Sequence, residues 1–479
     1  MIFASVLLIN LARLLVSADS STEAINYVCV ELERAYPDKL HYPGDAAYEK
    51  EQLRYWSIYN TNTRPACTFQ PTLAEEVSVA VKLIAKETVP FAIKSGGHNH
   101  NSFSAIKDGV LIALGNMNTV QNLGNGSAIV GPGNRWIDVY SKLQEDGLVV
   151  VGGRMSDVGV GGLLLGGGLS FLSFEHGLAA DNVLEYEVVL ADGNIVRASQ
   201  YSRSDLFYAL KGGCNQFGIV TEFKLKTYSI DLVWGGIVTY SIELQEDLFK
   251  AFENLRLARN SKVSLTPYLV RTTNSSVFTA IIFYNGPDPG NVFDEFLSIK
   301  SIARDLRTRT YPEYVENFSV GSEINNYGWI LRSESTGASL DLYETTFNLW
   351  KNLTDPLVHE SSTQWSLAYQ LIPKSVSQGP KADAYALLDE DLIWLIISSG
   401  YGNSNDRQDE IEAGRQLGYK IEEAEADSKS KTRYRPLFLN DAWEDQQVFQ
   451  SWSSYKDLKK TKEKYDPLNI WGRTGGFKL

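Results

Sequence analysis

The chain has little positive charge for its size. Its 479 residues contain 45 lysines and arginines against 58 aspartates and glutamates, which gives a formal net charge of −13 and a sequence pI near 5.1. No stretch combines a basic cluster with interleaved aromatics, the usual pattern of a nucleic-acid-binding surface. We therefore expect no nucleic-acid partner and no anionic membrane surface as a partner.

Long apolar runs are also missing. Beyond the N-terminus, no segment approaches the ~18 uninterrupted apolar residues that a membrane-spanning helix needs. Residues Met1–Ala18 contain the apolar stretch Ile2–Ile9 and end in Val16-Ser17-Ala18, which fits a signal peptide cleaved after Ala18. The segment lacks a basic n-region, and Asn10 and Arg13 interrupt it, so a retained apolar helix is the alternative. N-glycosylation triplets, which also occur by chance, begin at Asn125, Asn274, Asn317 and Asn352. The expected location is the secretory pathway or outside the cell.

Cysteine is scarce, with three in the chain. In an oxidising compartment Cys29 and Cys67 can pair and tether the N-terminal segment to the first domain, which leaves Cys214 as a buried thiol. The sequence alone does not fix this pairing.

The commonest phosphate-binding loops are absent. The glycine run Val158–Leu169 (VGVGGLLLGGGL) has no Gly-Lys-Ser/Thr ending, which excludes a P-loop, and Leu164 stands where the last glycine of a G-x-G-x-x-G motif belongs. What is present is a histidine on a two-glycine turn, Lys94–His98 (KSGGH), and six glycines in the ten positions Gly159–Gly168. Glycines let backbone N–H groups approach a phosphate closely, so the pattern favours a flavin cofactor. A glycine-rich turn at a sheet edge is the alternative when the run is considered alone.

Hydrophobic periodicity predicts an α+β first half. A capping box at Thr72–Glu75 starts a helix that extends to about Lys86. Further predicted elements are strands at 90–94, 110–114, 128–130, 149–151 and 219–228, helices at 134–145 and 206–210, and a hairpin over 183–197.

The pattern changes after about Ile230. Long strand candidates at 234–240, 277–284 and 392–398 alternate with helices at 245–259 and 409–417. This alternation predicts a second α+β domain with a largely antiparallel sheet. The residues from Asn440 onward return to short helices that can pack back on the first domain.

Several short segments occur in a fixed order from Cys29 to the end of the chain. They are Arg64–Cys67 (RPAC), Ser95–His98 (SGGH), Gly152–Arg154 (GGR), Val158–Gly162 (VGVGG), Gly166–Gly168 (GGG), Gly177–Val183 (GLAADNV), Gly212–Thr221 (GGCNQFGIVT) and Tyr465–Pro467 (YDP). Together they resemble the berberine-bridge-enzyme-like flavin oxidases of the vanillyl-alcohol-oxidase superfamily, particularly the fungal FAD-linked oxidoreductases.

The resemblance implies an α+β, two-domain PCMH-type FAD-binding fold. It implies an FAD-binding domain at 60–230, a substrate-binding domain at 231–439 and a C-terminal segment at 440–479 that completes the FAD-binding domain. It further implies a covalent bond from the flavin 8α-methyl group to His98, because a neutral imidazole can attack the electrophilic methide tautomer of that group. A metal site at His98 and His100 lacks further clustered ligands, and none is expected. The implied cofactor-binding residues are Ser95, Gly96, Gly97, His98, Gly159, Gly161, Gly162, Gly166, Gly167 and Ile219.

Two positions depart from the family pattern. Met155 stands where some members carry a cysteine that forms a second flavin bond, and a thioether cannot form it, so a single covalent bond is expected. Phe438-Leu439-Asn440 replaces the Tyr-x-Asn whose tyrosine is suspected as the catalytic base, so no phenol is available there.

The catalytic candidates are therefore Asn440, which is expected to face the flavin, and Tyr434. Asp441 and His176 are further substitutes for the missing base. Each of these side chains has a structural role as the alternative. Arg154 and Lys94 can offset flavin or phosphate charge, with an exposed charge as the equally simple interpretation.

The expected function is an FAD-dependent oxidase that passes a hydride from a small organic molecule to flavin N5, with molecular oxygen as acceptor. The resemblance implies secondary metabolism with a polyketide-like substrate, and we expect a monomer. A secreted carbohydrate or alcohol oxidase is one alternative, with Trp329, Trp350 and Trp365 either stacking on sugar rings or packing in the core. A flavin-free secreted binding module is the other.

Overall fold

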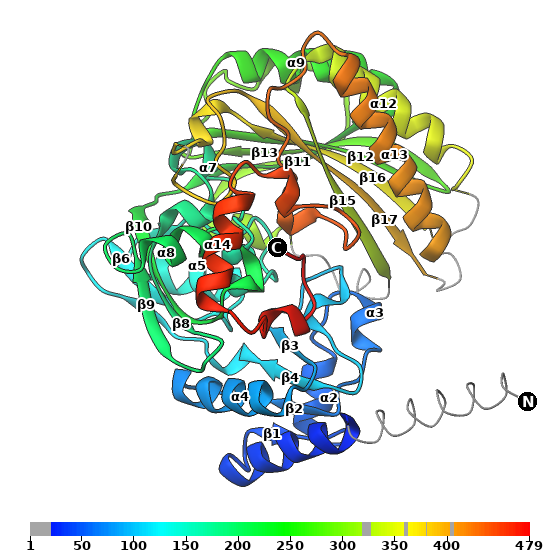
Figure 1. Cartoon of the computed structure of the whole chain (residues 1–479). Helices are drawn as coiled ribbons and strands as arrows, with labels where there is room; N and C mark the ends of the chain where they lie inside the picture. The colour runs from blue at the N-terminus through cyan, green and yellow to red at the C-terminus, as the bar shows by residue number, and fades with distance from the viewer. Residues whose placement is uncertain (1–20, 319–326, 359–362, 380, 403–406) are drawn as a thin grey trace, which may run out of the picture.

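The computed structural model describes residues 21–318, 327–358, 363–379, 381–402 and 407–479. The predicted signal peptide lies outside these residues. Figure 1 shows the first half of the chain, from blue to green, below and to the left of a large sheet that the second half forms. The red C-terminal segment lies between them.

The first sheet leads the chain to the predicted cofactor turn. Its strand order is β1-β2-β4-β3, and β2, β4 and β3 are parallel. Parallel strands need crossover connections, and helix α4 connects β2 to β3, which lie on either side of β4. Glu76 caps this helix by accepting the N–H groups of Thr72 and Leu73, so the capping residue is Glu76 and not the predicted Glu75. The elements are β1 (Leu40–His41), α2 (Ala46–Gln52), α3 (Ile58–Thr61), β2 (Cys67–Phe69), α4 (Ala74–Glu87), β3 (Phe91–Lys94) and β4 (Val110–Ala113).

The second sheet is built from the chain on both sides of the glycine run. Its order is β5-β6-β10-β8-β9, and β7 pairs with β10. All its pairings are antiparallel. The elements are β5 (Val120–Asn122), β6 (Ser127–Val130), α5 (Trp136–Gln144), β7 (Leu148–Val150), α6 (Val160–Leu165), α7 (Ser173–His176), β8 (Val183–Val189), β9 (Ile195–Ser199), α8 (Ser204–Leu210) and β10 (Ile219–Ser229).

The third sheet has seven strands in the order β14-β11-β13-β12-β16-β17-β15, and every neighbouring pair is antiparallel. Helices α9, α12 and α13 cover its outer face (Figure 1). The predicted α+β class and the antiparallel second sheet are confirmed. The elements are β11 (Val233–Ser241), α9 (Gln245–Leu257), β12 (Val263–Thr272), β13 (Ser275–Tyr284), α10 (Asp294–Ser298), β14 (Ser301–Arg309), α11 (Tyr311–Glu316), β15 (Gly328–Gly337), α12 (Leu340–Thr354), β16 (Thr363–Ile372), β17 (Leu392–Tyr401) and α13 (Arg407–Asp427).

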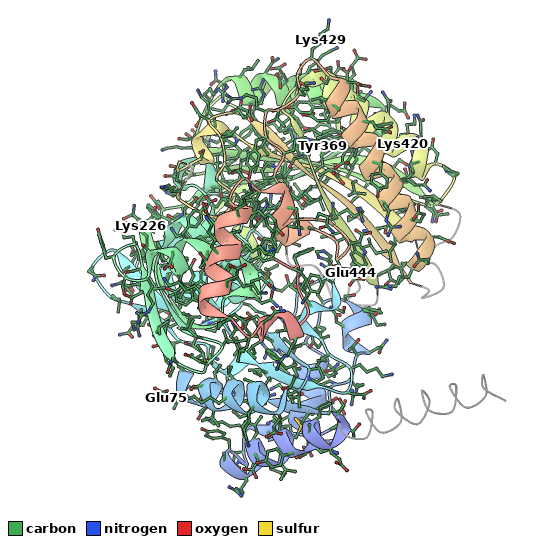
Figure 2. The ribbon with its side chains drawn as sticks, viewed as in Figure 1. Glu75, Lys226, Tyr369, Lys420, Lys429 and Glu444 are labelled. Atoms are coloured by element: carbon green, nitrogen blue, oxygen red, sulfur yellow. A yellow bond between two sulfur atoms is a disulfide. The ribbon has the colours of Figure 1, made fainter. Side chains whose placement is uncertain are left out.

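Strand β16 shows how the two faces of this sheet divide. The hydroxyl of Tyr369, labelled in Figure 2, donates to the carbonyl of Tyr343 on α12 at 3.1 Å, so this side chain lies on the face that the helices cover. Trp365 lies on the same face and is fully buried, as is Trp350 of α12, so both tryptophans belong to the core. Side chains alternate along a strand, so Gln364, Ser366 and Gln370 point to the opposite, inner face.

The C-terminal segment returns to the first half. After α14 (Tyr455–Tyr465), the carboxylate of Asp466 accepts the N–H groups of Ile470 at 2.6 Å and Trp471 at 2.9 Å. This turn places the Trp471 ring against Phe91 of β3, with centroids 6.0 Å apart. The last residues of the chain therefore support the strand that carries the His98 turn.

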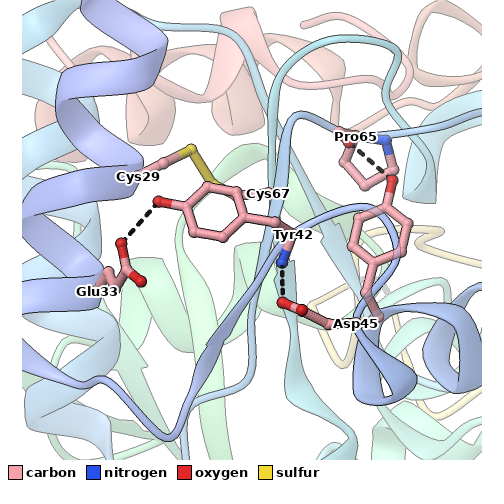
Figure 3. Close-up of a disulfide and its surroundings, with 7 residues drawn as sticks. Cys29, Glu33, Tyr42, Asp45, Pro65 and Cys67 are labelled. Carbon is pink, nitrogen blue, oxygen red and sulfur yellow. Dashed lines mark hydrogen bonds between the residues drawn. A yellow bond between two sulfur atoms is a disulfide. The ribbon is translucent and has the colours of Figure 1, made fainter.

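A disulfide joins Cys29, on a helix at 21–35, to Cys67 at the start of β2 (Figure 3), so the pairing that the sequence left open is formed. Next to it, the Tyr42 phenol donates to Glu33 at 3.0 Å, and the Tyr42 N–H donates to Asp45 at 2.7 Å (Figure 3). The bridge fixes the N-terminal helix against the first sheet. Cys214 carries a free thiol, whose pKa burial raises to about 11.

None of the helices that the structure describes combines the length and the apolar character needed to span a bilayer.

Candidate active site

A cavity of about 490 Å³ opens between the first half and the inner face of the seven-stranded sheet. This volume lies in the range of small-molecule and cofactor sites. The His98 turn, the glycine run, the start of β10 and the C-terminal segment form one side. The predicted residues on its wall are Ser95, Gly96, Gly97, His98, Gly159, Gly161, Gly162, Ile219 and Asn440.

Two glycines bring the His98 turn and the glycine run into contact. A Cβ atom on Gly96 would lie 2.4 Å from the Cα of Gly159, closer than real Cβ atoms come to a backbone atom. Arg135 locks the contact, because its guanidinium donates to the carbonyl of Gly96 at 2.9 Å and to the carbonyl of Asp157. The Ser95 hydroxyl also accepts the N–H of Gly161 at 3.2 Å. The predicted glycines therefore join two distant segments of the chain into one wall.

His98 is held on the face of an aromatic ring. Its imidazole stacks on Trp56 with centroids 4.5 Å apart, and Trp56 stacks on Trp329 at 5.3 Å. Nε2 of His98 lies 3.5 Å from Oδ2 of Asp157. Among the described residues, neither this Nε2 nor Oδ1 of Asp157 has a hydrogen-bond partner. Nothing in the sequence pattern pointed to Trp56 or Asp157.

His100 is a core residue. It is buried, and its Nε2 lies 2.8 Å from the carbonyl oxygen of Ala442. Burial lowers its pKa to about 4, so the ring is neutral at physiological pH. In the described part of the chain, no three His, Cys, Asp or Glu side chains gather into a group that could hold a metal ion.

Asn440 lies on the cavity wall, but both ends of its amide are used by the glycine run. Its Oδ1 accepts the N–H of Gly168 at 3.0 Å, and its Nδ2 donates to the carbonyl of Gly162 at 3.3 Å. A Cβ on Gly166 would lie 2.2 Å from Nδ2 of Asn440, and a Cβ on Gly167 would lie 2.5 Å from the ring of Tyr385. Gly166 and Gly167 therefore lie behind the wall and make room for these two side chains.

Tyr434 is not on the cavity wall. Its hydroxyl donates to the carbonyl of Tyr385 at 2.6 Å and accepts the N–H of Ser453 at 3.0 Å. Because both sides of the phenol are engaged with backbone, the structure assigns Tyr434 a structural role in place of the predicted catalytic one. Phe438 does line the cavity, and it stacks on Trp394 at 4.4 Å.

Asp441 is the titratable group best placed for chemistry. It lines the cavity, and its Oδ2 accepts a hydrogen bond from Nε2 of Gln370 at 2.9 Å. Arg154, also on the wall, donates to Oε1 of the same glutamine. Desolvation raises the pKa of Asp441 to about 6, although Arg154 and Gln370 oppose that rise. A carboxyl with this pKa can accept a proton near neutral pH.

Two other sequence candidates lie elsewhere. The His176 ring stacks on Tyr228 at 3.8 Å, and neither residue lines the cavity. Lys94 is fully buried, and its ammonium group donates to Oε1 of Glu51 at 2.5 Å and to the Glu51 carbonyl at 2.9 Å. Its charge is balanced by Glu51, so it is not free to neutralise a cofactor phosphate.

The sheet side of the cavity is mainly apolar. In one cross-strand row, Val270 pairs with Ser366, Ser366 with Ser398, and Ser398 with Leu331. All four line the cavity. The two serine hydroxyls lie 2.5 Å apart and form a hydrogen bond with each other, so each already has one hydrogen-bond partner.

The amino-acid sequence matches the family described as "FAD binding domain" over residues 65–199. An FAD-linked oxidoreductase of Arthroderma benhamiae is 33% identical over 464 residues, which cover 91% of this chain and 92% of that protein. The chain belongs to the FAD-linked oxidoreductases. The FAD-dependent monooxygenase prx3 of Penicillium roqueforti is also 33% identical, over 98% of this chain and 96% of its own.

Solved structures of the same fold include berberine bridge enzyme from Eschscholzia californica, with a TM-score of 0.76 at 19% identity, over 92% of this chain and 97% of that one. A chitooligosaccharide oxidase has a TM-score of 0.77 at 20% identity, over 95% of this chain and the whole of that one. At these identities the likeness establishes the fold. This oxidoreductase therefore has the berberine-bridge-enzyme-like architecture that its motifs indicated.

The residues present fit FAD. Glycines expose backbone groups on the cavity wall, and Gly162 has open space where a Cβ would stand. His98 lies on the same wall beside Asp157, whose buried Oδ1 has no hydrogen-bond partner among the described residues. Met155 lines the same cavity.

Proposed function

We propose that this oxidoreductase is an FAD-dependent oxidase that holds its flavin through one covalent bond to His98. The observation that carries the proposal is the shared cavity: the His98 turn and the glycine run face the inner side of the seven-stranded sheet across one space of about 490 Å³. Met155 cannot form a second linkage. Bound FAD would supply an acceptor for the hydride of the substrate.

Asp441 is the proposed catalytic residue for proton transfer. Oxidation of an alcohol removes a hydride from carbon and a proton from oxygen, and the proton needs an acceptor within reach of the cavity. Asp441 lies on the wall with a pKa near 6, and Gln370 orients its carboxylate. Arg154 keeps the glutamine amide in place from the other side. Asp441 would therefore supply the base that Phe438, which has no phenol, cannot provide.

The proposed substrate is a compact, largely apolar alcohol of the kind found in polyketide-like secondary metabolites. Val270, Leu331 and Ile396 face the cavity from the sheet, and Ser366 and Ser398 bond to one another. An oligosaccharide needs many hydrogen-bonding partners, because buried hydroxyls without partners cost free energy. The apolar sheet side therefore favours the metabolite over the sugar.

Secretion and oxygen as the electron acceptor belong to the same proposal. The Cys29–Cys67 disulfide fits an oxidising compartment, since such bonds are rare in the cytosol. The acceptor asparagines Asn125, Asn274 and Asn352 are exposed, as glycosylation would require. We further propose that the protein acts as a monomer.

An anaerobic titration tests the proposed function. The purified protein is mixed with cello- and chito-oligosaccharides, simple aliphatic alcohols, or benzylic and allylic alcohols with fused rings, and bleaching of the flavin absorbance is followed. Bleaching by the ring-bearing alcohols, with hydrogen peroxide formed on admission of air, is the expected result. Bleaching by the oligosaccharides would contradict the proposed metabolite substrate and favour a carbohydrate oxidase. A colourless protein from a flavin-rich host would contradict the proposed oxidase and favour a flavin-free binding module.

A further inference from the structure

His98 and Asp157 come from different loops, and their side chains meet at the edge of the cavity. Oδ2 of Asp157 lies 3.5 Å from Nε2 of His98, and the side chains are only 29% and 14% exposed. The other carboxylate oxygen, Oδ1, is buried and has no hydrogen-bond partner among the residues described. A buried polar atom without a partner is costly, so this arrangement calls for a functional explanation.

Contacts to the backbone of the two loops hold them in this position. The Arg135 guanidinium donates to the carbonyls of Gly96 and Asp157, which immobilises both loops at once. The close contact of Gly96 with Gly159 fixes their separation. Trp56 restricts the imidazole from its face, with an interplanar angle of 9°. The His98–Asp157 distance is therefore set by contacts outside the pair.

Asp157 is charged in this position. Burial favours the neutral carboxyl, but the His98 side chain and the Arg135 guanidinium outweigh it and lower the pKa of Asp157 below its ordinary value. A carboxylate next to one imidazole nitrogen favours the tautomer that carries its proton on that nitrogen. The lone pair is then on Nδ1.

We propose that Asp157 is the positioning residue for attachment of the flavin: it holds the proton on Nε2 of His98 and leaves Nδ1 as the nucleophile that bonds to the flavin 8α-carbon. The inference rests on the proposed covalent link at His98. It adds Asp157 as the residue that sets the tautomer of this histidine before attachment.

In the attachment step, one bond forms between Nδ1 and the 8α-carbon, and one C–H bond of the 8α-methyl group breaks. The imidazole loses its Nε2 proton, with Asp157 as the first acceptor. Both protons and the electron pair of the broken C–H bond end in the flavin ring, which is thereby reduced. Molecular oxygen then takes up two electrons and two protons to give hydrogen peroxide and restores the oxidised flavin.

The experiment measures attachment directly. Full-length protein is produced without flavin in a riboflavin-limited host and mixed with FAD. Samples are denatured in acid over time, and the flavin that stays with the protein is measured by fluorescence. Asp157→Ala should slow attachment about a hundredfold, the scale of general-base assistance. Asp157→Glu should restore most of the rate, and formate in the buffer should partly rescue Asp157→Ala.

Asp457→Asn is the matched control, because it removes one aspartate charge from a side chain that is 75% exposed on α14, and its attachment rate should equal that of the wild type. Quenching of FAD fluorescence on mixing reports non-covalent binding, which Asp157→Ala should retain. A wild-type attachment rate in Asp157→Ala would overturn the inference, as would a slow rate that neither formate nor Asp157→Glu restores. Absence of covalent flavin in the wild type would instead refute the proposed link at His98.

Discussion

Nε2 of Gln370 lies 2.9 Å from Oδ2 of Asp441, and the same glutamine amide accepts a hydrogen bond from Arg154. The glutamine thus connects a cation on one part of the cavity wall to a titratable carboxyl on another. Gln370 is almost fully buried, so it has little freedom to turn away. This link fixes the carboxylate of Asp441, the proposed proton acceptor.

Asp441→Asn should lower the rate of anaerobic flavin reduction by about a hundredfold, the usual contribution of a general base. The amide is nearly isosteric but cannot accept the substrate proton. Flavin content should be unchanged, because the proposed attachment residue is His98 and not Asp441. Stopped-flow absorbance with a reactive ring-bearing alcohol measures the rate, and Asp457→Asn serves as the matched control. An unchanged rate in Asp441→Asn would remove the residue from the mechanism.

The rate of flavin reduction in the wild type should rise with pH through about 6. Desolvation raises the pKa of Asp441 to about 6, so below that pH the carboxyl keeps its own proton and cannot accept another. Above it, the carboxylate is available. A pH profile between about 4 and 8, roughly two units to either side of this pKa, checks this. The remaining activity of Asp441→Asn should lack the acidic limb, and a limb that persists there must come from another group.

Gly96→Ala should destabilise the protein by roughly 1–3 kcal/mol, the usual cost of overpacking. The added methyl group would lie 2.4 Å from the Cα of Gly159 and force the two loops apart. In the flavin-free protein Gly162→Ala is the matched control, since its methyl group meets no protein atom within 4 Å. Thermal unfolding followed by circular dichroism compares the two variants. Equal melting temperatures would contradict the close contact between the loops.

Regular elements with clear periodicity were predictable from the sequence, and those stabilised by distant partners were not. Strand β15 was missed because its centre, Arg332–Ser335, is polar yet buried. Hydrogen-bond partners of this polar stretch lie about a hundred residues later: Gln446 accepts the N–H of Ser333 at 3.0 Å, and the Ser335 hydroxyl donates to the carbonyl of Pro436. No local pattern encodes such contacts, which arise only when segments about a hundred residues apart meet.

The residues of the candidate site fall into the same two groups, those predictable from a local motif and those positioned by distant partners. His98 and five of the seven predicted glycines lie on the cavity wall, and they could be predicted because they stand in short local motifs. Asp157 could not be predicted as a partner of His98, because contacts that form only in the folded chain, such as Gly96 against Gly159, bring the two loops together. Tyr434 was predicted as catalytic from its position in a matching segment. In the structure its hydroxyl instead forms hydrogen bonds with backbone groups of Tyr385 and Ser453.

Replacing Cys29 and Cys67 together by serine should lower the free energy of unfolding by about 4 kcal/mol, the chain-entropy value for a crosslink spanning 38 residues. Covalent flavin content should stay the same, because neither cysteine lines the cavity. Urea unfolding monitored by fluorescence measures the change, and Cys214→Ser is the comparison without a lost crosslink. A double variant as stable as the wild type would mean that the bond does not constrain the unfolded chain.

The most direct test of the account is peptide mass spectrometry on the denatured protein. The account predicts that one tryptic peptide, the one containing His98, carries a single FAD, and that His98→Ala releases all flavin on denaturation. FAD that dissociates from the denatured wild type, or that remains bound after His98→Ala, would contradict it.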